Sequence, residues 1–330
     1  MAAGNFLQHS GAGRSCTHPP VRAMRHGRIR VGISGWRYKG WRGSFYPAQL
    51  RQKDELAYAA SRFSTVEING TFYSLQRPDY FAAWREQTPA RFIFAVKGPR
   101  FITHMLKLSR PEIPLANFFG NGLLALREKL GPILWQFPPQ FRFDRDKLSR
   151  FFELLPRDTE AAARIGRKHD HRITGRVWLR TDSKRRLRHA VEIRHDSFRC
   201  AEFIDLLREH DIALVVADTV EWPLLFDVTA DFVYCRLHGS EQLYTSGYES
   251  AALDVWARRA VAWAGGGELR DGHCAHSRTA RTLQSRDVFV YFDNDAKVRA
   301  PFDAQALEKK VVRLLEAGVS AHTAAGGGQI

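Results

Sequence analysis

Short runs of apolar, often β-branched residues alternate along the chain with longer segments in which apolar residues recur at helical spacing. The short runs predict eight strands, at Ile29–Ser34, Thr65–Asn69, Phe92–Lys97, Ile133–Phe137, His189–Arg194, Ala213–Asp218, Phe232–His238 and Val288–Asp293. The segments between them predict helices at Asp79–Gln87, Asp144–Leu155, Ala201–Glu209, Ala251–Trp263 and Ala304–Leu315. Because eight βα units suffice to close a parallel barrel, the pattern predicts one α/β domain, a TIM-like (β/α)8-type barrel over residues 29–316.

Several segments interrupt or flank this pattern. Residues 1–28 and 317–330 are expected to be disordered tails, and the proline-containing connection from Gly98 to Asn121 is expected to be a loop over the barrel mouth. Residues 157–188 are interpreted as a basic insert with a short strand at Val177–Leu179, and residues 265–286 as a flexible insert that begins with three glycines. Met24 stands just before the first strand, so Met1 and Met24 are both open as the natural start.

Composition narrows the class of protein. The 330 residues are 44% hydrophobic and 26% charged, which allows a sizeable core and excludes global disorder. No apolar run approaches the roughly 18 residues that a membrane span requires, so no membrane partner is expected. The four cysteines lie far apart without a C-x-x-C pair, which is typical of a protein in the reducing cytoplasm.

The net charge of +15 is concentrated in two places. Residues 1–30 carry five arginines and no acidic residue, and residues 157–188 carry 11 Lys and Arg against four acidic residues, a difference of +7. A basic stripe of this kind can bind nucleic-acid phosphates, but solvated arginine-rich loops have the same composition. Both interpretations stay open.

The predicted strands begin apolar and end polar. In a barrel, the last inward-facing residues line the C-terminal face, where barrel enzymes place their sites. Charged residues in otherwise apolar strands are costly unless they are paired, so their recurrence at one end of the strands indicates a shared polar site. These strand-end residues are Glu67, Asn69, Lys97, Gln136, Glu192, Arg194, His195, Asp218, Arg236, His238, Asp293, Asn294 and Asp295.

Residue chemistry suggests roles within and beside this set. Carboxylates and histidines suit acid–base catalysis, and the candidate catalytic residues are Glu67, His104, Glu192 and His238. The candidate ligand-binding residues are Asn69, Tyr73, Lys97, Gln136, Arg194, His195, Asp218, Arg236, Asn294 and Asp295. The three cations among them, Lys97, Arg194 and Arg236, can hold a phosphate or a carboxylate.

A divalent metal is the alternative ligand for this site. Glu67, Glu192 and Asp218 with His195 and His238 have the donor atoms that such a metal needs. The neighbouring cations would compete for the same carboxylates, so a metal-free site for a small anionic or phosphorylated ligand is favoured. No P-loop or dinucleotide-binding glycine motif occurs, and the cofactor stays unknown.

The motifs at the strand ends resemble those of the YecE-like family, a domain of unknown function (number 72 in its series) with a TIM-barrel-like fold. The matching stretches are Val31–Trp36, Gly40–Pro47, Val66–Tyr73, Ile102–His104, Gly131–Pro139, Val191–His195, Tyr234–Gly239 and Tyr291–Asp295. The resemblance implies the barrel fold and a shared site at the strand ends, but no reaction. The chain departs from the family pattern at residues 265–286, where the family runs directly from helix to last strand.

Two classes of function follow from these observations. The first is an enzyme of unknown reaction that binds a small anionic or phosphorylated ligand at the C-terminal face. The alternative is a nucleic-acid-binding protein, or a metal-assisted phosphoesterase resembling endonuclease IV barrels, an analogy that rests on fold alone. The residues leave the oligomeric state open.

Overall fold

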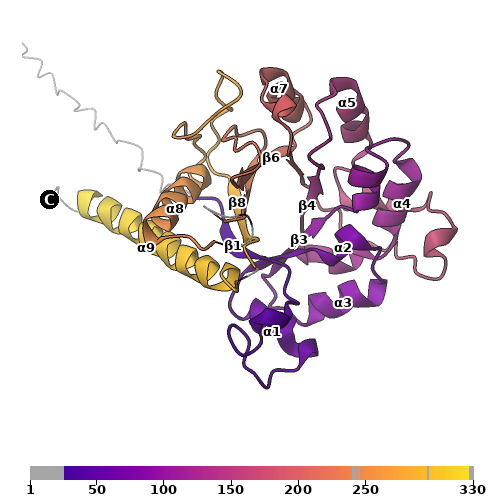
Figure 1. Cartoon of the computed structure of the whole chain (residues 1–330), viewed down its shortest axis with the longest axis horizontal. Coiled ribbons are helices and arrows are strands. Elements are labelled where there is room, and N and C mark those ends of the chain that lie inside the picture. Colours follow the sequence, from indigo (N-terminus) through magenta and orange to yellow (C-terminus); the bar gives the residue numbers. More distant parts are fainter. Residues whose placement is uncertain (1–25, 240–242, 244–245, 296, 327–330) are drawn as a thin grey trace, which may run out of the picture.

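Eight parallel strands close into a barrel in the computed structural model, which describes residues 26–239, 243, 246–295 and 297–326 (Figure 1). Each strand pairs with its neighbours in sequence order, and β8 pairs with β1 to complete the circle. The strands are β1 (Ile29–Ser34), β2 (Thr65–Ile68), β3 (Ile93–Lys97), β4 (Leu130–Gln136), β5 (His189–Glu192), β6 (Ala213–Asp218), β7 (Phe232–Leu237) and β8 (Asp287–Phe292). The predicted TIM-like (β/α)8 fold, with its eight strands in one domain, is therefore confirmed.

The helices lie outside the barrel, where they cover the outward-facing apolar side chains of the strands (Figure 1). They are α1 (Glu55–Ala60), α2 (Gly70–Tyr73), α3 (Pro78–Glu86), α4 (Glu112–Gly120), α5 (Arg145–Leu154), α6 (Thr159–Gly166), α7 (Ala201–Glu209), α8 (Ser250–Ala264) and α9 (Ala300–Gly326). Helices α8 and α9 lie side by side against the side of the barrel formed by β1 and β8. None of the described helices is long and apolar enough to cross a membrane.

Large and small side chains alternate around the barrel interior and fill it. Aromatic residues from β7 and β8 face alanines from β3, β5 and β6, as an eight-stranded barrel requires if it is to hold a packed core rather than a pore. The inward apolar residues are Ala95, Leu134, Ala190, Ala213, Val215, Ala217, Phe232, Tyr234, Phe289 and Tyr291. At Gly32 of β1, a Cβ would lie 2.1 Å from the Thr65 carbonyl oxygen, so only glycine allows β1 and β2 to approach this closely.

The connection between Gly98 and Asn121 is more regular than the predicted loop. It contains a π-helix at Phe101–Met105 and helix α4. The prolines do not prevent this, because Pro111 is the N-cap residue of α4 and Pro114 lies in its first turn, where no backbone donor is lost. Burial of Leu115, Phe118 and Phe119 anchors the helix.

The basic segment 157–188 also differs from the prediction. Its first part is helix α6, in which the Asp158 side chain caps the N-terminus by accepting a hydrogen bond from the Ala161 N–H at 2.7 Å. No strand forms at Val177–Leu179. Instead, the Trp178 N–H donates to the Gly120 carbonyl at 2.8 Å, a single bridge that fixes the segment beside α4.

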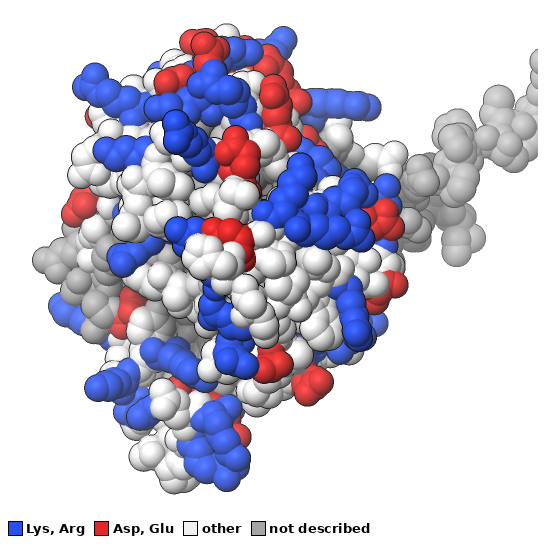
Figure 2. Space-filling view, turned by 90° about the vertical axis from the view of Figure 1, so that its right-hand side faces the viewer, with Lys and Arg blue, Asp and Glu red and all other residues white. Residues whose placement is uncertain are grey.

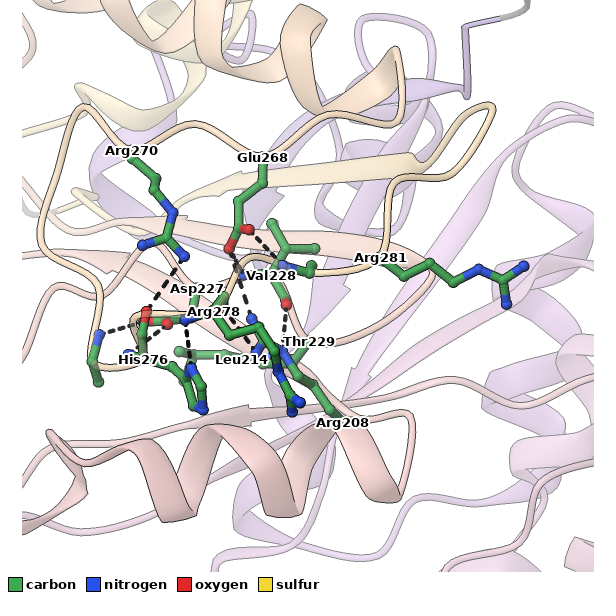
Figure 3. A network of polar contacts seen from close by, with 12 residues as sticks. Arg208, Leu214, Asp227, Val228, Thr229, Glu268, Arg270, His276, Arg278 and Arg281 are labelled. Carbon is green, nitrogen blue, oxygen red and sulfur yellow. Dashed lines mark hydrogen bonds and ion pairs between the residues drawn. The ribbon is translucent and has the colours of Figure 1, made fainter.

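Residues 265–286 have no helix or strand, as their lack of apolar period predicts, but they are attached to the barrel (Figure 3). The Asp227 carboxylate accepts hydrogen bonds from the backbone N–H groups of Ala275 and His276 at 2.7 and 3.0 Å. Glu268 accepts from the N–H groups of Val228 and Ala280 at 3.1 and 2.6 Å. These two carboxylates place the segment over the loop before β7, and its flexibility stays a prediction.

Both tails are shorter than predicted, because residues next to each of them belong to the described fold. Gly27 and Arg28 donate backbone hydrogen bonds to Ala264 and Asp287, so they belong to the barrel. The last helix continues to Gly326 rather than ending at Leu315, because the added stretch is rich in alanine, the strongest helix former. Residues 1–25 and 327–330, with the open question of Met1 or Met24, lie outside the described residues.

Candidate functional site

A buried polar layer closes the apolar interior at the C-terminal ends of the strands. Four of its six members stand two positions after an inward apolar residue of the same strand, so strand geometry brings them to one level of the barrel. The members are Ser34, Glu67, Gln136, Glu192, Arg236 and Asp293. The structure thus brings Glu67, Gln136, Glu192 and Arg236 together in one hydrogen-bonded layer.

Arg236 is the centre of this layer and is fully buried. Its Nη1 donates to Glu192 Oε2 at 2.6 Å, and its Nη2 lies 2.9 Å from Glu67 Oε1 and 2.7 Å from Asp293 Oδ2. One guanidinium thus contacts three carboxylates from three sides of the barrel. Charge-assisted hydrogen bonds of this length are among the strong ones, and here they replace the water that burial removes.

Further donors contact the oxygens of Glu67 and Glu192. The Tyr234 hydroxyl donates to Glu67 Oε2 at 2.6 Å, and the Ser34 hydroxyl donates to Glu67 Oε1 at 2.5 Å. Gln136 Nε2 donates to Glu192 Oε1 at 2.8 Å, and Arg194 reaches the same oxygen at 2.9 Å. The layer is therefore a connected network in which Glu67 and Glu192 each have three donors.

The network keeps its carboxylates ionised. Burial by itself raises the pKa of Glu192, but the Arg236 and Arg194 guanidiniums outweigh it and hold this pKa well below its ordinary value. Burial likewise opposes ionisation of Asp293, and Arg236 with His238 lowers its pKa. His238 Nδ1 lies 3.2 Å from Asp293 Oδ2. Both carboxylates are thus negatively charged at neutral pH.

A cavity of about 750 Å³ opens above this layer, within the size range of small-molecule sites. Its walls come from loops after β1, β2, β3, β5 and β8. The lining residues are Tyr38, Asn69, Phe72, Tyr73, Lys97, Arg100, His104, Met105, Gln136, Arg194, Asp293 and Asp295. Seven of the sequence candidates are in this set: Asn69, Tyr73, Lys97, His104, Gln136, Arg194 and Asp295.

Besides Asp293, and besides Tyr38, whose pKa burial raises, three titratable groups on the cavity wall have shifted pKa values. Burial and then Arg236 lower the pKa of Lys97 to about 8. Burial, followed by the charges of Arg194 and Lys97, lowers the pKa of His104 to about 4, so its imidazole is neutral at pH 7. Burial and the nearby Asp293 raise the pKa of Asp295 to about 6. Shifts of this kind concentrate at functional sites.

Arg100 and Arg194 supply two further positive charges to the cavity. The exposed Arg100 guanidinium lies 5.3 Å from the Tyr73 ring and has no ion pair with a described residue. The Arg194 guanidinium lies 3.7 Å over Trp222 and is paired with Glu192. Stacking on an aromatic ring fixes a guanidinium in place and leaves its edge to meet an anion.

Other sequence candidates do not line this cavity. Glu67, Glu192, Arg236 and His238 lie in the buried layer beneath it, where they support the lining residues. Asp218 points toward α8 and accepts a hydrogen bond from Trp256 Nε1 at 3.2 Å.

The last two candidates hold the backbone around the site. Asn294 lies on the side of α9, where its amide donates to Asp303 at 2.8 Å and to the Ser246 carbonyl at 2.9 Å. His195 caps the short helix Asp196–Phe198 by accepting from the Ser197 N–H at 3.0 Å. The assigned catalytic and binding roles all stay predictions.

Sequence reasoning missed several residues of the site. Ser34 and Tyr234 are uncharged strand residues that both donate to Glu67. Tyr234 stands two positions before Arg236 on the same strand, so alternation could have shown that it faces inward. Ser34 has no such charged neighbour on its strand. Tyr38 and Arg100 belong to loops and Phe72 to the four-residue helix α2, which are too short or irregular for a periodicity to fix the direction of a side chain.

Part of the basic charge of segment 157–188 is neutralised. Arg185 and Arg172 pair with acidic residues of the same segment, and Arg188 pairs with Asp231 and Asp287. Figure 2, which views the side of the molecule where this segment lies, shows Lys and Arg in separate groups with Asp and Glu between them. The surface is therefore a mixed one with local basic clusters.

The described residues contain no group of three or more His, Cys, Asp or Glu side chains arranged to hold a metal ion. The three carboxylates of the buried layer surround Arg236 instead. A divalent metal at this position would have to compete with a guanidinium that already contacts all three.

Comparison with known proteins places the chain in a family. The profile of a family described as "Protein of unknown function DUF72" matches residues 30–324. The chain belongs to the DUF72 family. Among curated relatives, the chain is 30% identical over 129 residues to the UPF0759 protein YunF of Bacillus subtilis (strain 168), which covers 37% of this chain and 44% of the relative. It is 30% identical over 133 residues to the UPF0759 protein YecE of Escherichia coli (strain K12), covering 35% of this chain and 46% of the relative.

These alignments span less than half the length of the curated relatives. Solved structures extend the likeness across the barrel. A DUF72 family protein from Thermotoga maritima MSB8 matches with a TM-score of 0.64 and 25% identity over 86% of this chain and 98% of that chain. A DUF72 family protein from Enterococcus faecalis V583 matches with a TM-score of 0.61 and 17% identity over 86% and 95% of the two chains, which shows the fold alone. The resemblance to the YecE-like family is thereby confirmed.

Proposed function

We propose that this DUF72 protein is a cytoplasmic enzyme that binds a small phosphorylated ligand in the 750 Å³ cavity and acts on it by acid–base chemistry. The observation that supports it is the presence of Lys97, Arg100 and Arg194 on the wall of one cavity. Arginine can contact a phosphate through two N–H groups at once, and lysine adds a compact point charge.

Two groups on the same wall suit proton transfer. Asp295, with its pKa raised to about 6, exchanges protons near neutral pH and can act as general acid or base. His104 is neutral at pH 7, and its Nδ1 lies 2.8 Å from the Thr103 hydroxyl, so its ring orientation is fixed. A neutral imidazole beside cations can polarise a ligand group through a hydrogen bond without adding charge.

The cavity has room for more than a phosphate. A second cavity of about 350 Å³ shares Tyr38, Asn69 and Tyr73 with the first and extends toward Trp36 and Trp84. Its aromatic walls favour an organic ring or chain attached to the anionic group. The two cavities together therefore favour a phosphorylated organic compound over inorganic phosphate.

Thermal-shift measurements with a panel of phosphorylated sugars and acids, each beside its unphosphorylated parent, test this proposal. We expect at least one phosphorylated compound to raise the melting temperature and its parent to have no effect. Replacement of Arg100 by Met should then weaken binding by about 10- to 100-fold, because a hydrogen bond to a charged group contributes roughly 1.5–3 kcal/mol.

Arg62→Met is the matched control, because Arg62 is an exposed arginine stacked on Tyr58 outside the cavity lining. It removes the same charge and should leave binding unchanged. A panel without any phosphate-dependent stabilisation, or equal weakening by both variants, would contradict the proposal.

Nucleic-acid binding is the second candidate function. It is favoured by Arg164, Arg167 and Lys168 at the C-terminal end of α6, which are exposed and have no ion pair with described residues. Changing these three to Ala should reduce DNA or RNA affinity and lower the steepness of its salt dependence. Arg62→Met is again the control. If the triple variant binds nucleic acid as tightly as the wild type and this control do, this surface is not the interface.

A metal-assisted phosphoesterase is a further alternative within the same site. It requires a metal to displace Arg236 from Glu67, Glu192 and Asp293. Metal analysis of purified wild type and Glu192→Gln by plasma mass spectrometry tests it. Stoichiometric metal that disappears in the variant would favour this alternative.

A further inference from the structure

Lys97 has the surroundings of a nucleophilic amine rather than those of a structural cation. It is the last residue of β3, only 7% exposed, and it lines the candidate cavity. Its Nζ lies 4.3 Å from the centre of the Phe72 ring. Buried lysines are normally held by a carboxylate, yet among the described residues none lies within 4 Å of this amine.

The nearby carboxylates are already committed to other donors. Arg236 contacts Glu67, Glu192 and Asp293. Tyr234 and Ser34 also donate to Glu67, and Gln136 and Arg194 also donate to Glu192. Lys97 thus faces charges of both signs without a direct ion pair. Burial and Arg236 favour the neutral amine, which is the form that carries a lone pair.

We propose that Lys97 forms an imine with a small anionic aldehyde or ketone bound in this cavity. The inference rests on the proposed function, because Arg100 and Arg194 supply the charges that would hold the anionic group of such a ligand. It deepens that function by naming a carbonyl as the reacting group.

The step balances with the groups present. The Lys97 Nζ lone pair attacks the carbonyl carbon, a C–N bond forms, and the C=O π electrons move to oxygen. A proton passes from nitrogen to that oxygen to give a carbinolamine. Protonation of the hydroxyl by the acid form of Asp295 lets it leave as water, and the nitrogen lone pair forms the C=N bond. Water reverses the sequence, so no oxidant or reductant is needed.

Reductive trapping tests the imine directly. Full-length protein is incubated with dihydroxyacetone phosphate or pyruvate and sodium cyanoborohydride, then digested and mapped by mass spectrometry. We expect the Lys97 peptide to gain the mass of the carbonyl compound minus one oxygen. Exposed Lys53 and Lys168 are internal references. Near neutral pH the neutral fraction of Lys97 exceeds that of an ordinary lysine on the order of 100-fold, so labelling should be at least about ten-fold faster.

The variant Lys97→Met keeps a long apolar stem and should lose this adduct while the reference lysines label as before. A second measurement uses the wild type and so does not depend on the folding of that variant. The protein is labelled with trace acetic anhydride across pH 6–10, a range chosen around the Lys97 pKa of about 8. Lys97 should react at lower pH than Lys53. Labelling of Lys97 no faster than that of the reference lysines in both measurements would overturn the proposal.

The outcomes separate this inference from the proposed function. Phosphate-dependent thermal stabilisation without a Lys97 adduct would overturn the imine and leave the anion site intact. A Lys97 adduct that forms equally fast with neutral dihydroxyacetone and with its phosphate would support the imine and contradict the anion site. An adduct that forms faster with the phosphate supports both.

Discussion

Replacing Arg236 with Met removes the guanidinium that contacts all three carboxylates of the buried layer. Breaking a buried ion pair by removing one partner typically costs about 3–5 kcal/mol, because the other charge stays buried and uncompensated. Glu67 keeps Tyr234 and Ser34, and Glu192 keeps Gln136 and Arg194. We therefore expect a loss of about 3–5 kcal/mol in the free energy of unfolding at pH 8, rather than a separate loss for each contact.

The loss should depend on pH in a defined direction. In the wild type, Arg236 lowers the pKa of Glu192 and Asp293. The stability that these two carboxylates contribute to the fold is therefore present above pH ~4 and is lost as the pH falls further. Without Arg236, burial dominates and raises these pKa values above those of the unfolded chain. The folded variant then binds more protons than the unfolded chain, so its stability falls as the pH rises from about 5 to 8.

Urea unfolding at pH 5 and pH 8, followed by circular dichroism and tryptophan fluorescence, measures both effects. Arg62→Met, the exposed control, should stay within about 0.5 kcal/mol of wild type at both pH values. If Arg236→Met lies within about 1 kcal/mol of wild type at pH 8, or is no more stable at pH 5 than at pH 8, the reasoning is wrong.

Two further predictions concern the cavity and the segment around Asp227. Ionised Asp295 repels an anion, so its protonation should strengthen binding of a phosphorylated ligand as the pH falls through about 6. Asp295→Asn should remove this contribution and leave only the dependence that comes from the ligand's own phosphate, which also titrates at about 6. Titration calorimetry between pH 5 and 7.5 measures this, and an unchanged pH profile in the variant would disprove it. Asp227→Ala should expose residues 265–286 to limited proteolysis and cost about 1–3 kcal/mol, because two backbone N–H groups lose their acceptor; wild-type resistance of that segment in the variant would contradict the role of Asp227.

The barrel could be predicted because each strand contributes its own pattern. Runs such as residues 213–217 and 232–235 are apolar on both faces, as expected for parallel strands covered by helices. The connections were less predictable. Helix α6 has a short apolar face within a basic stretch, so charge composition obscured its period. The position of residues 265–286 depends on Asp227, which lies 48 positions before Ala275 in the chain.

Most residues of the candidate site could be predicted from the sequence, but not which of them are buried and which line the cavity. The positions of Glu67, Glu192 and Arg236 at strand ends indicate that they lie together, as they do. Nothing in the sequence indicates that Arg236 lies at the centre of the layer or that the cavity lies above it. Alternation could have separated Asp218 from the site, because Val215 and Ala217 of the same strand face inward and Asp218 does not. The electrostatics of Asp295 depend on burial, which only the folded loop defines.

The charges around the cavity are balanced before any ligand arrives. Arg236, Arg194 and Lys97 oppose Glu67, Glu192 and Asp293, all within or directly above the buried layer. At the cavity wall, Arg100 adds a positive charge that an incoming anion can meet, and Asp295 adds a negative charge that opposes the anion. Proton uptake by Asp295 is the least costly adjustment, since its pKa is already raised to about 6. Binding of an anion would thus protonate Asp295 and, by the same event, place an acid beside the ligand.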